Sequence, residues 1–193
     1  MMLRELILKN RSYRRFDEKI DISSEDLEEM IEATRFSASA KNLQSLKYYL
    51  SNNRKLNEKI FTTLSWAGYL SNWNGPENGE KPSAYIIQLN DTQISTNYFC
   101  DDGIAAQSIL LTSVEKGYGG CIIASVKKEK LNDILSLPKH LTIIQVIAIG
   151  KPSEKVVIEN LRDNNIQYWR DENGVHHVPK RNLEDLIISP KAD

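Results

Sequence analysis

The sequence is poor in cysteine and histidine and has no long apolar run. Its 193 residues include two cysteines and three histidines. Cys100 and Cys121 flank a predicted helix that would hold them well over ~20 Å apart, so no disulfide within one chain is expected. This cysteine usage favours a reducing, cytoplasmic setting. No segment approaches the roughly 20 apolar residues of a membrane span, and the first ten residues resemble an amphipathic helix more than a signal peptide.

An excess of charge of either sign is also missing. The formal net charge is −1, so no overall field favours nucleic acid or an anionic membrane, and neither is expected as a partner. Hydrophobic residues make up 40% and charged residues 26%, which is ordinary for a soluble globular protein. The length suits one domain with a sizeable core, and we expect a single domain over residues 1–193.

Several common catalytic motifs are absent. No G-x-G-x-x-G opens a helix after a strand, and there is no P-loop and no G-x-S-x-G elbow. The histidines at 140, 176 and 177 do not have H-E-x-x-H spacing, so no metal site is predicted. Hydrolytic catalysis therefore lacks a visible nucleophile and base.

The stretch from Asp101 to Ser125 is the most informative part of the chain. Two acids begin a predicted helix and Lys116-Gly117 ends it. Residues 104–111 are apolar or small on nearly every side, so both faces of this helix are expected to meet protein. A helix that joins the core to a second subunit and a central helix of a monomer satisfy this pattern equally well. The turn 117–120 would bring backbone N–H groups close to whatever lies beside the helix end.

The remaining periodicity predicts an α+β fold. Helices are expected over 3–10, from Ser23 onward, over 54–64 and over 127–135, and strands over 47–51, 85–89 and 141–149. Residues 155–165 are predicted to be a polar connector, and Asn173-Gly174 to form a turn. Helices and strands do not alternate strictly, which argues against a doubly wound sheet.

Three polar clusters are candidates for binding. Arg11, Ser12, Tyr13 and Arg14 could hold a phosphate, although a solvated basic loop is the simpler explanation. Residues 35–44 are rich in small and amide side chains, which suit a planar polar ring or a sugar chain, or else a plain polar loop. Lys180 and Arg181 form a second basic pair near the other end of the chain. This inventory suits a cofactor that brings its own chemistry.

The segment 65–83 carries three aromatic residues among glycines and prolines. A long loop of this kind is often a binding lid, and a satellite apolar cluster is the alternative.

In this order, the motifs resemble those of the nitroreductase family of FMN-dependent oxidoreductases that use NAD(P)H. The matching stretches are 11–14, 39–44 and 103–125, with the Pro179-Lys180-Arg181 tail. The resemblance implies a central mixed sheet flanked by helices, in an interlocked homodimer with FMN at the interface. It further implies hydride transfer from NAD(P)H through flavin N5 to a nitroaromatic, a quinone or a similar acceptor, in alternating half-reactions.

The resemblance also assigns cofactor-binding roles, and no catalytic side chain is required. Arg11 and Ser12 would contact the phosphate and ribityl chain, and Arg14 the pyrimidine edge of the flavin. Backbone N–H groups near Ala124 and Ser125 would face N5. The full implied set is Arg11, Ser12, Tyr13, Arg14, Ser39, Ala40, Asn42, Gln44, Ala124, Ser125, Lys180 and Arg181.

The sequence departs from the family pattern at four positions. Ala38 and Ser45 stand where proline is common, Ser108 where asparagine is common, and Ala124 where glycine or glutamate is common. Reductive dehalogenation or flavin-consuming chemistry on the same fold, and an FMN sensor or store without reductase activity, are the alternative functions.

Overall fold

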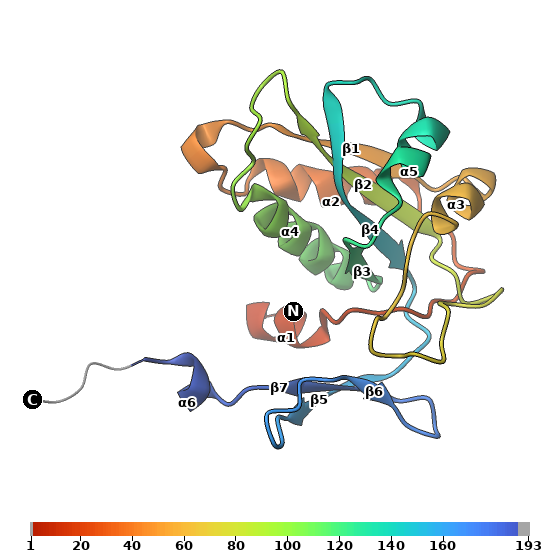
Figure 1. Cartoon of the computed structure of the whole chain (residues 1–193), viewed down its shortest axis with the longest axis vertical. Helices are drawn as coiled ribbons and strands as arrows, with labels where there is room; N and C mark the ends of the chain where they lie inside the picture. The colour runs from red at the N-terminus through yellow and green to blue at the C-terminus, as the bar shows by residue number, and fades with distance from the viewer. Residues whose placement is uncertain (1, 189–193) are drawn as a thin grey trace, which may run out of the picture.

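The computed structural model describes residues 2–188, which form two sheets and their covering helices (Figure 1). The helices are α1 (Leu3–Lys9), α2 (Ser24–Arg35), α3 (Arg54–Phe61), α4 (Asp101–Glu115), α5 (Lys128–Leu135) and α6 (Leu183–Leu186), with a 3-10 turn at Ala40–Asn42. The strands are β1 (Leu46–Ser51), β2 (Ala84–Asp91), β3 (Gly119–Ile123), β4 (Leu141–Gly150), β5 (Val156–Asn160), β6 (Trp169–Arg170) and β7 (His176–Lys180).

The central sheet has the strand order β1-β2-β4-β3, and all three strand pairs are antiparallel. At its edge, Ser12 forms an isolated parallel bridge with Gly120 of β3. The smaller sheet has the order β5-β7-β6 and is itself mixed, because β5 runs parallel and β6 antiparallel to β7. The fold is therefore α+β, as the sequence predicts.

Helices cover both faces of the central sheet. Alternate residues of a strand point to opposite faces. Accordingly, Ile86 and Ile147 pack with α2 and α4, whereas Ile87 and Val146 pack with α3 and α5. All eight residues of β2 are buried, which is what two covered faces require. Figure 1 shows the four helices on the two sides of the sheet, with the smaller sheet below α1.

Most predicted elements are present. Ser23 caps α2, where its side chain accepts a hydrogen bond from the N–H of Asp26. The prediction for residues 155–165 is wrong, because β5 lies within this segment. Its pairing partner, β7, is some twenty residues further on, and the pairing is invisible to local patterning. The predicted turn at Asn173-Gly174 joins β6 to β7, and Gly174 takes a positive φ of 75° there.

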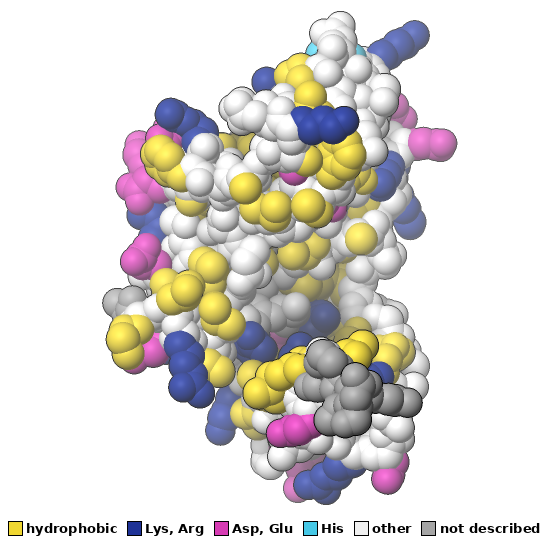
Figure 2. All heavy atoms as spheres, turned by 90° about the vertical axis from the view of Figure 1, so that its left-hand side faces the viewer, with side chains coloured by type: hydrophobic (Ala, Val, Ile, Leu, Met, Phe, Trp, Pro, Cys, Tyr) yellow, Lys and Arg dark blue, Asp and Glu magenta, His cyan; other side chains and the backbone are white. Residues whose placement is uncertain are grey.

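Only one side of α4 is covered within the chain. Ala106 and Ile109 are fully buried against the sheet, whereas Gly103, Ile104 and Gln107 are exposed. No side chain of α1 is buried either. Figure 2, which faces the left-hand side of Figure 1, shows hydrophobic side chains spread over this surface and a hollow between the main body and the C-terminal part. A second subunit against α4 stays a prediction.

Both cysteines are free thiols, as predicted, with Cys100 exposed and Cys121 buried. Within residues 2–188, no helix is long and apolar enough to cross a membrane.

The packing of α4 can be tested with Ile109→Ala. Truncating this fully buried side chain should lower the free energy of unfolding by about 2–5 kcal/mol, because a cavity is left in the core. Denaturant unfolding at a fixed protein concentration measures the change. The same substitution at Ile94, which is 44% exposed, should stay within about 0.5 kcal/mol of the unmodified protein. Equal effects at the two positions would contradict the assigned core.

Candidate functional site

Two glycines let the N-terminal segment lie against the edge of the central sheet. A Cβ on Gly119 would stand 2.5 Å from the ring of Tyr13, and a Cβ on Gly150 would stand 2.6 Å from the ring of Phe16. Neither distance is sterically allowed for a side chain. The N–H of Tyr13 donates to the carbonyl of Gly120 at 3.0 Å. This close approach fixes the path of residues 12–16 and so places Arg14 at the end of β3.

Arg14 lines a cavity of about 200 Å³ together with Ala124 and Ser125. Two of the predicted groups, which are some 110 positions apart in the sequence, therefore meet. Residues 65–68 line the same cavity. The guanidinium Nη1 donates to the carbonyl of Ser12 and lies 3.2 Å from Nε2 of His176. The guanidinium carbon stands 4.9 Å from the centre of the Tyr168 ring.

The backbone at this cavity carries unused donors. The carbonyls of Ala124 and Ser125 accept hydrogen bonds from Val126 and Ser65. Among residues 2–188, the N–H groups of the same two residues donate to no protein acceptor. Backbone N–H groups seek a partner, so this edge fits a ligand that presents a hydrogen-bond acceptor. A flavin ring carries such acceptors, and the cationic guanidinium beside it fits the same group.

His176 is fully buried beside two cations. Burial lowers the pKa of its imidazole to about 4, and the positive charges of Arg14, Arg170 and the neighbouring His177 act in the same direction. The ring is therefore neutral at physiological pH. In contrast, hydrogen bonds to Glu159 and Asp171 raise the pKa of His177.

The second predicted group forms a separate cavity. Ser39, Asn42 and Gln44 line a hollow of about 220 Å³. The buried carboxylate of Asp101 accepts hydrogen bonds from the Ser39 hydroxyl at 2.6 Å and from the N–H of Ala40 at 2.9 Å.

The loop over residues 39–44 is conformationally strained. Lys41, Asn42 and Gln44 have φ values of 53–55°, in the left-handed region that only glycine enters freely. The hydroxyl of Ser39 also accepts from the N–H of Gln44. Asp101 and Ser39 thus hold this loop in a shape that its sequence alone does not favour.

The remaining basic groups lie apart from these cavities within one chain. Arg11 donates to the carbonyl of Ile7, while its Nε is buried and has no partner within residues 2–188. Arg181 lies 3.4 Å from the side-chain oxygen of Asn164, and Lys180 is exposed at the end of β7. The chain by itself does not gather these residues with Arg14 into one cavity, so their joint contact with a phosphate stays a prediction.

The aromatic segment 65–83 is both a wall and an apolar cluster. Trp66 belongs to the core under α3, with its ring 5.9 Å from that of Phe61. Trp73 lies against the guanidinium of Arg170, 4.6 Å from ring centre to guanidinium carbon. Residues 65–68 also line the Arg14 cavity, and the role of the segment as a binding lid stays a prediction.

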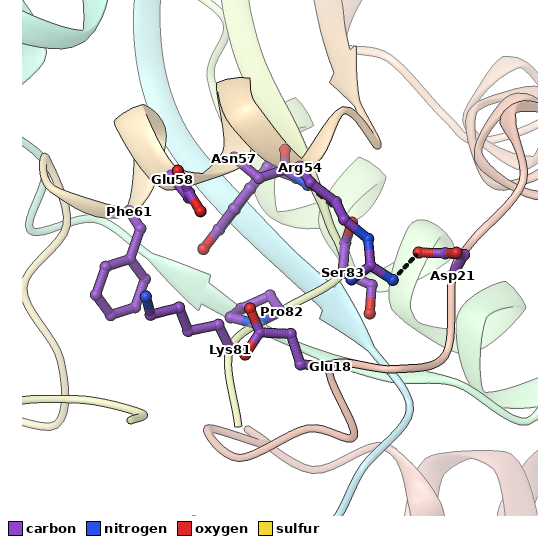
Figure 3. A pocket seen from close by; sticks show the side chains of 10 residues that line it. Glu18, Asp21, Arg54, Asn57, Glu58, Phe61, Lys81, Pro82 and Ser83 are labelled. Carbon is purple, nitrogen blue, oxygen red and sulfur yellow. Dashed lines mark hydrogen bonds and ion pairs between the residues drawn. The ribbon is translucent and has the colours of Figure 1, made fainter. Parts of the chain in front are cut away.

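A third cavity, of about 110 Å³, lies between α3 and two loop segments (Figure 3). Two of its charged side chains, Arg54 and Lys81, have partners of their own. Arg54 and Asp21 form an ion pair at 2.8 Å, and the ammonium of Lys81 lies 5.1 Å from the centre of the Phe61 ring. None of the predicted cofactor residues lines it.

Four residues that organise these cavities were not predicted as site residues. The sequence indicates only a helix-end charge at Asp101, and for His176 it shows only that H-E-x-x-H spacing is absent. Glu154 is almost fully buried and accepts from the N–H groups of Arg14 and Arg15 as well as from Arg170. Tyr168 stacks on Arg14. Local sequence offered no signal for these, since each acts on a residue more than 60 positions away.

Comparisons with known proteins identify the family of this chain. Residues 7–69 and 81–151 match the model of the Nitroreductase family. An Archaeoglobus fulgidus protein, provisionally named an NADH dehydrogenase/NAD(P)H nitroreductase, is 23% identical over 159 residues, which are 78% of this chain and 86% of that protein.

Solved structures share the fold. A nitroreductase family protein from Clostridium novyi NT superposes with a TM-score of 0.66 at 20% identity, covering 93% of this chain and 95% of its own. An FMN-dependent nitroreductase from Clostridium difficile R20291 gives 0.62 at 18% identity, covering 82% and 91%. The chain therefore belongs to the nitroreductase family, a family of oxidoreductases.

The environment of His176 predicts an acid-dependent loss of stability. Its folded pKa lies below the unfolded value of about 6.5, so its contribution is complete above pH ~6.5 and is lost as the pH falls towards 4. His176→Gln cannot titrate and should lose roughly 1–3 kcal/mol less stability than the unmodified protein between pH ~7 and pH ~4.5. Denaturant unfolding at both pH values measures this.

His177→Gln is the matched control, because the pKa of His177 is raised instead. The contribution of His177 is complete below pH ~6.5 and is lost as the pH rises through its folded pKa. This variant should therefore lose more stability on acidification than the unmodified protein. If both variants lost more stability on acidification than the unmodified protein, or both lost less, the environments of the two histidines would be assigned incorrectly.

Proposed function

We propose that the protein is an FMN-dependent oxidoreductase that accepts hydride from NAD(P)H and reduces a nitroaromatic, a quinone or a similar acceptor. The observation that carries the proposal is the meeting of Arg14 with the unpaired N–H groups of Ala124 and Ser125 at one cavity. When bound, the flavin supplies the electron transfer, and the protein supplies binding, orientation and charge. Family membership and the name of the Clostridium difficile relative support the choice of FMN.

The dimensions of the cavities support a site shared between two chains. The Arg14 cavity and the Ser39 cavity measure about 200 and 220 Å³, and each is smaller than the usual ~300–1,000 Å³ of a cofactor site. We place one flavin between the Arg14 cavity of one subunit and the Ser39 cavity of its partner. The exposed face of α4 and the exposed apolar side chains of α1 would lie in the same homodimer interface.

Within this site, each group has a role that its chemistry allows. The guanidinium of Arg14 is permanently cationic and favours a ring that gains negative charge on reduction. Arg11, with its unpaired buried Nε, would bind the phosphate together with Ser12, Lys180 and Arg181. Residues 65–68, which line the same cavity as Arg14, would contact the acceptor and so influence which acceptors are reduced.

The proposal predicts a yellow protein. Freshly purified protein, or protein given FMN and then desalted, should show flavin absorbance that bleaches when NADH or NADPH is added without oxygen. Adding a quinone or a nitroaromatic should restore the absorbance. A colourless protein that takes up no added FMN would contradict the cofactor, and bound FMN that no reductant bleaches would favour a store or sensor.

Arg14→Ala should weaken FMN binding about 10- to 100-fold, because a hydrogen bond to a charged group contributes about 1.5–3 kcal/mol. It should also slow reduction by NAD(P)H. Fluorescence titration and anaerobic stopped-flow measure the two effects. Arg54→Ala removes an exposed arginine from the third cavity and should change neither. Unchanged affinity and an unchanged rate in Arg14→Ala would show that Arg14 does not contact the flavin.

A further inference from the structure

The side chain of Arg14 is held from the C-terminal sheet. Its Nη1 lies 3.2 Å from Nε2 of His176 in β7, and its guanidinium carbon lies 4.9 Å from the ring centre of Tyr168, just before β6. The rings of Tyr168 and His176 are themselves 5.2 Å apart. The cation therefore meets a ring face and a ring nitrogen that belong to one rigid unit.

The chemistry of this contact fixes the tautomer of His176. Arginine has only donors and stays protonated, so Nε2 of the imidazole must be the acceptor. The proton of the neutral ring then sits on Nδ1, which is buried and has no hydrogen-bond partner within residues 2–188. An unpartnered buried donor costs about 1–3 kcal/mol. An apolar ring could fill the same space, so packing alone does not explain a histidine at this position. The contact with Arg14 does explain it, because it requires the lone pair on Nε2 of the imidazole.

Hydrogen bonds also hold the backbone of both residues in this contact. The N–H of His176 donates to the carbonyl of Lys155 at 2.8 Å, which holds the start of β7. Glu154, the residue before Lys155, accepts from the N–H of Arg14 and pairs with Arg170 at 2.8 Å. Both ends of the Arg14–His176 contact are thus set by the same short stretch of chain.

We propose that His176 and Tyr168 are positioning residues for Arg14. They hold its guanidinium in one orientation at the cavity, and they act on the flavin only through that side chain. This inference rests on the proposed function, because it takes Arg14 to contact the flavin. Without them, the long arginine side chain would gain rotameric freedom, and binding would have to order it again.

The test compares His176→Phe, which removes the acceptor nitrogen, with His176→Gln, whose side-chain oxygen can still accept from Arg14. His176→Phe should raise the FMN dissociation constant about three- to tenfold, less than Arg14→Ala does, and should weaken binding of reduced FMN more than that of oxidised FMN. His176→Gln should restore most of both affinities. His177→Phe, at the next position of the same strand and so on the opposite face of the sheet, should bind FMN as the unmodified protein does.

A double variant that also carries Arg14→Ala distinguishes a positioning role of His176 from a general packing role. In the Arg14→Ala background, His176→Phe should cause no further change in either affinity, because its effect passes through the missing side chain. Additive losses in the double variant, or equal losses in the Phe and Gln variants, would overturn the proposal. So would His176→Phe with unchanged affinities.

Tyr168 gives a second route if His176→Phe does not fold, since this tyrosine is only partly buried. Tyr168→Phe keeps the ring under the guanidinium and should bind FMN normally, whereas Tyr168→Leu should weaken binding about three- to tenfold. Equal binding by these two variants would contradict the role of the ring. An unmodified protein that binds no FMN would overturn both this inference and the proposed function, whereas normal binding with no effect at 168 or 176 overturns the inference alone.

Discussion

The architecture depends on burying both faces of one antiparallel sheet. β2 and β4 have apolar side chains on both sides, so they are stable only when helices cover each face. The chain meets this constraint with α2 and α4 on one side and α3 and α5 on the other. The candidate binding segments lie at the edges of this core. They are the segment before Phe16, the end of β3, the loop before β1 and the outer side of α4.

Two small cavities lie at the edges of this core. At the end of β3, a cation and free backbone donors face a small cavity. At the start of α4, Asp101 holds the strained loop 39–44 around another. Each cavity is smaller than the usual ~300–1,000 Å³ of a cofactor site. We propose that two chains join them across the uncovered face of α4. In the proposed dimer, cofactor binding and subunit contact would be two aspects of the same interface.

Much of this arrangement follows from local sequence. The Ser23 cap, the long helix ending at Gly117 and the β-branched run of β4 are set by neighbouring residues, and each was predicted. The arginine motif and the amide-rich loop were candidates for binding, and residues of each line a cavity. What could not be predicted depends on distant contacts. β5 forms because β7 lies beside it, and His176 matters because Arg14, 162 positions earlier, lies against it. Residue spacing carries no information about such pairs.

A crystal structure of the protein with FMN bound tests the central claim most directly. We predict a two-fold dimer in which each isoalloxazine ring lies between Arg14 and Ala124 of one subunit and the loop 39–44 of its partner. A flavin held within a single subunit, or bound at the cavity beneath α3 instead, would contradict this account.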